Sequence, residues 1–369
     1  MLGRYRALAA DTSLGIIAEP MATLRPGDVY GDAARLTRML IAFGDLPPDS
    51  HLTAGFGSAP TAGWPPTNQS RYEGPLVDGV RQFQRRHGLD ADGVIGRRTL
   101  AALRVPLSWR VRQIELALER QRWLPHPSDE REILINIPMF RLWAWEPNRS
   151  APSFSMGVIV GRAIRTETPI FVQDMLDVIF RPYWNIPRSI VRNELLPLIT
   201  ADPEYLARQN MEIVDGAGDD AAVVEPTVDH LDQLRQGRLR LRQRPGPRNA
   251  LGLVKFVFPN EEHVYLHDTP AQRLFSRARR DFSHGCVRVE AAFDLAAWAL
   301  ADRPDWTRER IEEAVADDAP TRSVRLAHPI RVVLFYATAA VWPEDGTLHF
   351  ADDIYRHDER LDRALSARR

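Results

Sequence analysis

The 369-residue sequence lacks several features that would assign it to a familiar class of protein. It contains a single cysteine, Cys286, so it forms no internal disulfide, and its cysteine content does not identify the compartment where it works. No apolar run approaches the ~18 residues that a membrane-spanning helix needs, and the first residues lead into no apolar core of signal-peptide length. We therefore expect either a cytoplasmic protein or one whose targeting segment is not present in this chain.

The sequence also lacks an excess of either charge. Its 48 basic and 49 acidic residues give a net charge of -1, which argues against a nucleic-acid binder, because such a protein carries a basic surplus. Lys255 is the only lysine beside many arginines. A base-composition bias of the genome accounts for this choice, although arginine also suits ligands rich in carboxylates. With 44% hydrophobic residues the chain can bury a sizeable core, and its length predicts two or three domains.

Apolar residues at three- and four-residue spacing predict helices in the first third of the chain. One helix ends at Gly44, a second places Val80 and Phe83 on one face, and a third, short helix begins at Thr99. A charged amphipathic helix follows over residues 109–124. These patterns divide this region into an incomplete lead-in at 1–23, a three-helix unit at 24–105 with an insertion at about 47–70, and a linker helix at 106–126.

From residue 131 the apolar period changes to two, and many short strands separated by turn residues predict a sandwich or barrel-like core. A mixed segment at about 187–244 interrupts it, with a helical pattern at 190–199, an acidic loop-like stretch at 215–230 and an alternating strand at 238–244. Four arginines share one face of that strand, which is either solvated or binds carboxylates. The predicted fold class is therefore α+β and multidomain, with a β-rich domain at 127–358 that contains the insertion, and a polar tail at 359–369.

The stretch Ser283-His284-Gly285-Cys286-Val287-Arg288-Val289 carries the expected chemistry. A lone thiol that follows a glycine and lies within reach of an imidazole indicates an activated nucleophile. The run His263-Val264-Tyr265-Leu266-His267 alternates, so as a strand it places His263, Tyr265 and His267 on one face. An imidazole can accept the thiol proton near neutral pH, and both His267 and His284 are candidates for this base.

The base and the reacting carbonyl also need partners. Asp268, through its side chain or its backbone carbonyl, is the nearest candidate to fix the tautomer of His267. Gly285 permits an unusual backbone angle, which would turn the amides of Gly285 and Cys286 towards an oxyanion, a role worth about 3–4 kcal/mol per donor. Two other interpretations remain: a buried structural cysteine, or a zinc site built from the thiol and the three histidines named above, although their spacing matches no common zinc pattern.

These residues resemble the L,D-transpeptidase family, whose catalytic domain is of the YkuD type. That family carries a histidine, a spacer of the length seen here, and then Ser/Thr-His-Gly-Cys. Arg288 stands where many members have asparagine, which makes the chain similar to the larger YcbB-like branch with its capping insertion, as do residues 181–187. The stretch Gly88–Leu103, preceded by Val80–Gln84, looks like the peptidoglycan-binding domain of cell-wall enzymes. The resemblance covers about residues 24–358.

The resemblance implies roles for individual residues. Cys286 matches the nucleophile and His267 the general base, while His284 and Gly285 belong to the signature around the thiol. The residues expected near the substrate are Ser283, Arg288, Tyr265, Trp184 and Asn185. The implied reaction attacks the bond between the third and fourth residues of a peptidoglycan stem tetrapeptide, forms an acyl-thioester, and passes the acyl group to an amine of a second stem as a 3-3 cross-link, with no metal or cofactor.

Partners and location follow from the implied substrate. We expect peptidoglycan and carbapenem-type inhibitors as ligands, no nucleic acid, a role for other cell-wall enzymes as companions, and a site in the periplasm or at the cell surface. Two alternatives stay open: an L,D-carboxypeptidase or cysteine peptidase, in which water resolves the acyl-enzyme, and a non-catalytic wall-binding scaffold. The sequence leaves open the third stem residue, the acceptor and the oligomeric state.

Overall fold

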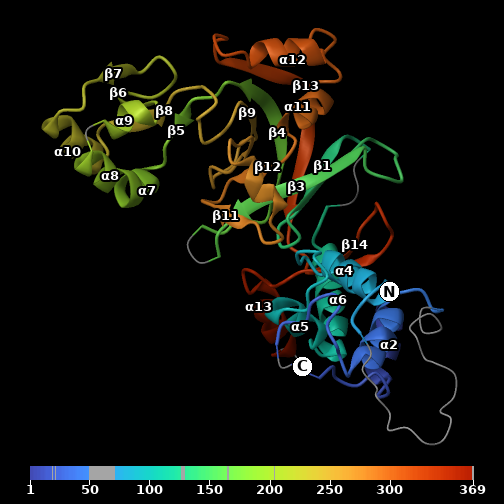
Figure 1. Cartoon of the computed structure of the whole chain (residues 1–369). Coiled ribbons are helices and arrows are strands. Elements are labelled where there is room, and N and C mark those ends of the chain that lie inside the picture. The colour runs from blue at the N-terminus through green and yellow to red at the C-terminus, as the bar shows by residue number, and fades with distance from the viewer. Residues whose placement is uncertain are drawn as a thin grey trace, which may run out of the picture.

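The computed structural model describes residues 1–18, 20, 22–49, 71–125, 129–163, 166–202 and 204–367. It shows a mixed α+β protein in which a β-barrel lies between a helical region and a mixed insertion (Figure 1). The predicted fold class is therefore confirmed. The predicted insertion at 47–70 falls almost wholly outside the described residues. Within them, no helix combines the length and the apolar character that crossing a membrane requires.

Three short helices enclose the core of the helical region. Leu36, Val80 and Phe83 are almost completely buried there, as their spacing predicts. The first of these helices ends where Gly44 adopts a φ of +81°, a left-handed conformation that favours glycine. The helices of this region are α1 (Leu2–Ala10), α2 (Ala33–Phe43), α4 (Pro75–Arg86), α5 (Arg97–Leu103), α6 (Leu107–Gln121) and α13 (His357–Ser366).

The first and last helices, α1 and α13, both lie beside α6, although the sequence predicts only a lead-in and a polar tail there (Figure 1). Each buries one side chain, Tyr5 in α1 and Asp358 in α13, so neither displays an apolar stripe. Asp358 forms a buried ion pair with Arg120 of α6. These helices were missed because long-range contacts hold them, which local apolar spacing does not reveal.

The barrel is one sheet closed on itself. Its strand order is β11-β3-β12-β10-β9-β4-β13-β1-β2, and β2 also pairs with β3, which closes the ring. Apolar side chains such as Leu266, Val287 and Val289 fill the interior, and helices α11 (Ala292–Ala299) and α12 (Arg308–Ala314) pack against the same core. The strands are β1 (Glu132–Asn136), β2 (Arg141–Trp145), β3 (Phe154–Gly161), β4 (Phe171–Phe180), β9 (Val254–Val257), β10 (Leu266–His267), β11 (Asp281–Ser283), β12 (Val287–Val289) and β13 (Arg322–Phe335).

A hairpin after the barrel joins it to the helical region. Strands β14 (Ala339–Val341) and β15 (Leu348–Phe350) pair in antiparallel fashion. Phe350 is buried in a small core with Tyr5 and Ile114. The two regions are therefore held together by shared apolar packing as well as by hydrogen bonds.

The insertion between β4 and β9 has its own hydrophobic core. The prediction of a loop at 215–230 is wrong in part, because β7 forms an edge strand against β6, and α10 begins where Thr227 caps its first turn. The insertion contains α7 (Arg188–Ile190), the π-helix η1 (Val191–Leu195), α8 (Leu196–Ala201), α9 (Tyr205–Arg208), α10 (Val228–Gln236), and a sheet of β5 (Trp184–Asn185), β8 (Arg240–Gln243), β6 (Met211–Asp215) and β7 (Ala222–Val224).

The arginine-rich strand of the insertion serves its own fold. Arg242 is buried, forms an ion pair with Glu212 at 2.5 Å and lies over the ring of Tyr183. Arg244 pairs with the same carboxylate. The prediction of a solvated face is therefore confirmed for Arg238, Arg240 and Arg244, which are exposed, and it is wrong for Arg242, which is buried against Glu212.

Candidate active site

Two neighbouring parallel strands place the site residues predicted from the sequence. In the pairing of β10 with β12, Leu266 lies opposite Val287 and His267 opposite Arg288. The amide of Val287 donates to the carbonyl oxygen of Tyr265 at 3.1 Å, so Tyr265 lies beside Cys286. Because Leu266 and Val287 point into the barrel, the functional side chains on either side of them point out of its wall.

Hydrogen bonds fix the conformation of the loop that precedes the thiol. Ser283 is 2% exposed, and its hydroxyl donates to the carbonyl oxygen of Cys286 at 2.5 Å. Gly285 has a φ of +115°, and Thr168 donates to its carbonyl oxygen at 2.7 Å. The amide of Gly285 donates to the Ser283 hydroxyl at 3.2 Å instead of facing an oxyanion. The structure thus differs from two predictions: Ser283 shapes the loop rather than reaching substrate, and the Gly285 amide already has an acceptor.

The thiol of Cys286 lies in an enclosed and positively charged setting. Within the described residues it hydrogen-bonds to the carbonyl oxygen of His263 at 3.8 Å and to Tyr265, and not to an imidazole. Burial raises the pKa of the Cys286 thiol, while hydrogen bonding to Tyr265 and the charges of Lys255 and Arg288 act in the opposite direction. A structural, inert cysteine would not need these neighbouring cations.

His267 is buried and held by the backbone. Its Nδ1 donates to the carbonyl oxygen of Asp268 at 2.5 Å, so the carbonyl rather than the carboxylate fixes the imidazole. The Asp268 carboxylate instead accepts from the amide of Leu253 at 2.9 Å. Burial, followed by the charge of Arg288, lowers the pKa of His267 to about 3, so the imidazole is neutral at pH 7.

His263 and His284 point elsewhere. His263 has a φ of +55° and lies outside the short strand β10, so the predicted alternation over five residues does not form. The Nε2 of His284 contacts the Glu194 carboxylate of the insertion at 2.7 Å. Because this nitrogen already has a partner, His284 is a weaker candidate for the base than His267. Across the described ranges, no group of three or more His, Cys, Asp or Glu side chains is arranged to hold a metal ion, so the zinc interpretation has no ligand set.

Sequence reasoning missed Lys255 as a residue of the site. It lies on β9 directly opposite His267, and its Nζ is 4.0 Å from the centre of the Tyr265 ring. Burial lowers the pKa of Lys255, and the charges of Cys286 and Asp219 oppose this shift. The available signal was its uniqueness: the only lysine of the chain interrupts an otherwise apolar strand.

The insertion covers this arrangement, as the resemblance implies. Besides the contact between His284 and Glu194, the Trp184 side chain hydrogen-bonds to the Tyr265 hydroxyl. Asp219, in a loop of the insertion, is close enough to raise the pKa of Lys255. Asn185, next to Trp184 on β5, has an exposed side chain and pairs through its backbone with β8. Trp184 therefore reaches the site, whereas Asn185 lies on the outer side of its strand.

Arg288 is a cation of the site without a counter-ion among the described residues. It is partly buried, and its Nε has no hydrogen-bond partner. Within the described part of the chain it forms no ion pair, and burial followed by the nearby charge of Arg162 lowers its pKa. A buried cation without a counter-ion is costly, so this position favours an anionic ligand.

Comparisons with known proteins agree with this geometry. The L,D-transpeptidase catalytic domain YkuD matches residues 130–315, and the "Putative peptidoglycan binding domain" matches residues 34–103. A "Putative L,D-transpeptidase" of Haemophilus influenzae is 34% identical over 252 residues, which make up 68% of this chain and 49% of that protein. The chain thus spans about half the length of this curated relative.

A solved structure was also found, that of the L,D-transpeptidase (residues 123-326) from Xylanimonas cellulosilytica. It is 14% identical, with a TM-score of 0.22, and the match covers 86% of this chain and 100% of that chain. The family rests instead on the catalytic-domain match, which spans half of the sequence and contains the thiol, the histidine and the two strands that bring them together. The chain belongs to the L,D-transpeptidase family, with a YkuD catalytic domain that follows a peptidoglycan-binding domain.

Proposed function

We propose that this protein is an L,D-transpeptidase that forms 3-3 cross-links in peptidoglycan. The Cys286 thiolate attacks the carbonyl between the third and fourth residues of a stem tetrapeptide, and the terminal D-amino acid leaves. The acyl-thioester is then resolved by an amine of a second stem. The observation that carries this proposal is the position of the only thiol, immediately before β12, near the charges of Lys255 and Arg288 and beneath the insertion.

The surrounding groups divide the work of acyl transfer. His267, which is neutral, accepts the thiol proton and returns it to the leaving amine, with the Asp268 carbonyl holding its ring. Lys255 and Arg288 stabilise the thiolate electrostatically, and the Tyr265 hydroxyl hydrogen-bonds to the sulfur. No step requires a metal or an organic cofactor.

The direct test follows the mass of the intact protein during incubation with disaccharide-tetrapeptide or with a carbapenem. The wild-type chain is expected to gain one acyl group, and Cys286→Ala is expected to gain none. As a control for folding, the two proteins are expected to unfold at the same temperature. An adduct on the Cys286→Ala variant would contradict the assignment of the nucleophile. A wild-type chain that folds correctly but never becomes acylated would support the scaffold alternative instead.

The products separate the two enzymatic candidates. Cross-linked dimers indicate transpeptidation, whereas disaccharide-tripeptide alone indicates the L,D-carboxypeptidase, in which water replaces the acceptor amine. Because peptidoglycan lies outside the cytoplasmic membrane, the proposed activity places the protein in the periplasm or at the cell surface. The helical region with its peptidoglycan-binding domain supports the same partner.

A further inference from the structure

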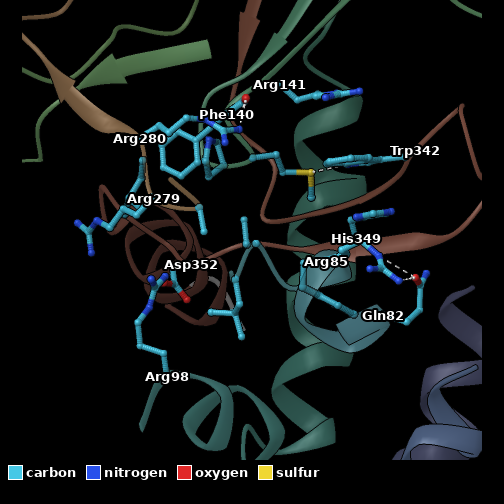
Figure 2. A pocket seen from close by; sticks show the side chains of 18 of the residues that line it. Gln82, Arg85, Arg98, Phe140, Arg141, Arg279, Arg280, Trp342, His349 and Asp352 are labelled. Carbon is cyan, nitrogen blue, oxygen red and sulfur yellow. Dashed lines mark hydrogen bonds between the residues drawn. The ribbon is translucent and has the colours of Figure 1, made fainter. Parts of the chain in front are cut away.

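A second cavity of the described residues is not lined by Cys286. It lies where the helical region meets the barrel, and it has a volume of about 370 Å³ (Figure 2). Arg85 and Arg98 approach it from α4 and α5, Arg141 from the start of β2, and Arg280 from the loop before β11. This volume is within the range of sites that take small molecules.

The walls of this junction cavity are held together firmly. Arg86 forms a buried ion pair with Asp45 at 2.6 Å and also donates to the carbonyl oxygen of Leu348 on β15. The ring of His87 stacks between those of Phe83 and Phe350. Two separate regions of the chain therefore form a preformed cavity, and neither region forms it alone.

The cavity has a surplus of positive charge, because five arginines and only two carboxylates, those of Asp345 and Asp352, are among its lining residues. Two of its arginines already have carboxylate partners: Arg141 pairs with Glu344, and Arg279 pairs with Asp281. Three further arginines, Arg85, Arg98 and Arg280, form no ion pair within the described part of the chain. Arg85 is held by the amide of Gln82, and Arg280 donates only to backbone carbonyls. Such uncompensated guanidinium groups favour a carboxylate.

Two buried polar atoms among the lining residues have no partner, namely Nε of Arg141 and Nδ1 of His349. His349 is 5% exposed, and its Nε2 lies 2.9 Å from Asp345, so its Nδ1 is left as an acceptor. The Nε–H of Arg141 is a donor. The cavity therefore offers a ligand one unpaired donor and one unpaired acceptor. The end of a peptide pairs with both, because its carboxylate oxygen accepts from the donor and its amide N–H donates to the acceptor.

The aromatic wall argues against a site that recognises sugar by stacking. Trp342 already stacks on His349 at 3.8 Å between ring centres, and Arg141 lies over its ring at 5.1 Å. Because these neighbours occupy the indole, the cavity recognises its ligand through charge and hydrogen bonds.

We infer that the junction cavity binds the carboxylate end of a peptide, of the kind that peptidoglycan stems provide. This inference rests on the proposed function for the choice of ligand. Residues 278–280 line the cavity and lead directly into β11, which ends at the loop before Cys286. A stem held there is bound by the same part of the barrel that carries the nucleophile loop.

The test measures binding by calorimetry, with disaccharide-tetrapeptide titrated into the full chain after a carbapenem has acylated Cys286. Binding is expected to persist in the acylated protein and to weaken about tenfold in Arg85→Gln/Arg98→Gln, and to fall with added salt. Arg97→Gln is the matched control, because Arg97 is a neighbouring exposed arginine of α5 that does not line the cavity. A tetrapeptide with an amidated carboxyl end is expected to lose the same factor.

Several outcomes would overturn the inference. They are the absence of binding to the acylated protein, equal binding by the double variant and by Arg97→Gln, and equal binding of the free and amidated ligands. Failure of the proposed function is distinguishable, because it appears as absence of acylation by the carbapenem. In that case the same titration is carried out on the unmodified chain, and the two arginines are still expected to matter.

Discussion

Replacing Lys255 with methionine tests the electrostatics of the site most directly. Methionine keeps much of the length of the side chain and removes its charge. The ammonium lies 4.0 Å from the Tyr265 ring, and the hydroxyl of that tyrosine hydrogen-bonds to Cys286. At a separation of roughly 6 Å and an effective dielectric constant of about 20, a unit charge stabilises a thiolate by about 3 kcal/mol. Solvent reaching the partly buried lysine reduces this figure, so we expect about a tenfold loss of thiolate near neutral pH.

The sign of the effect follows from the charges around the thiol. Lys255 and Arg288 lower the pKa of Cys286 against the effect of burial, so removing either cation raises that pKa further. The other charged or titratable groups near Lys255 are Tyr265, His267 and Asp219. Since all of them remain in the variant, the curve of reactivity against pH is expected to move to higher pH without changing its shape.

The assay uses the single cysteine of the chain, because alkylation by iodoacetamide then reports on Cys286 alone. The alkylation rate is measured from pH 5 to 10 for the wild type, Lys255→Met and Lys255→Arg. Arginine preserves the positive charge, so its curve is expected to stay near that of the wild type. A Lys255→Met curve that superimposes on that of the wild type, with both proteins unfolding at the same temperature, would refute the role of the Lys255 charge.

Two further predictions concern the backbone and the base. Gly252 has a φ of +64°, and a Cβ there would lie 2.3 Å from the Asp268 carboxylate, so Gly252→Ala is expected to lower the free energy of unfolding in urea by at least about 1–3 kcal/mol. Gly346→Ala, with the same φ and no atom within 4 Å, is the control and should lose less. His267→Ala is expected to reduce acylation of the thiol about 100-fold or more, and His284→Ala only a few-fold, when followed by mass spectrometry; equal losses would remove the distinction between the two histidines.

The sequence was sufficient where local patterns determine the structure. The helices α2 and α4 follow from apolar spacing and from the glycine or histidine that ends them, and the closed β-rich core follows from strand-length runs between turn residues. The nucleophile loop was recognisable because its residue types and order are unusual. The family could therefore be named before the structure, and the domain matches agree with it.

What the sequence did not reveal depends on pairing between distant segments. Lys255 joins the site only because β9 pairs with β10, and strand register is not encoded in either strand alone. The contact of His284 with Glu194 spans 90 residues, and the junction cavity needs walls from both ends of the chain. The sequence shows that the strand at 238–244 is rich in arginine, but it does not show that Glu212 pairs with Arg242 and Arg244.

The charges around His267 suggest how substrate prepares the base. In the free protein the imidazole is a poor proton acceptor, because burial and, next, the charge of Arg288 hold its pKa at about 3. Arg288 has no ion pair in the described part of the chain, so a substrate carboxylate bound there would neutralise a charge that opposes protonation of His267. The same event removes one cation that stabilises the thiolate, whereas Lys255 keeps its charge. We propose that a substrate carboxylate at Arg288 raises the pKa of both His267 and Cys286, so that Lys255 remains as the cation that stabilises the thiolate.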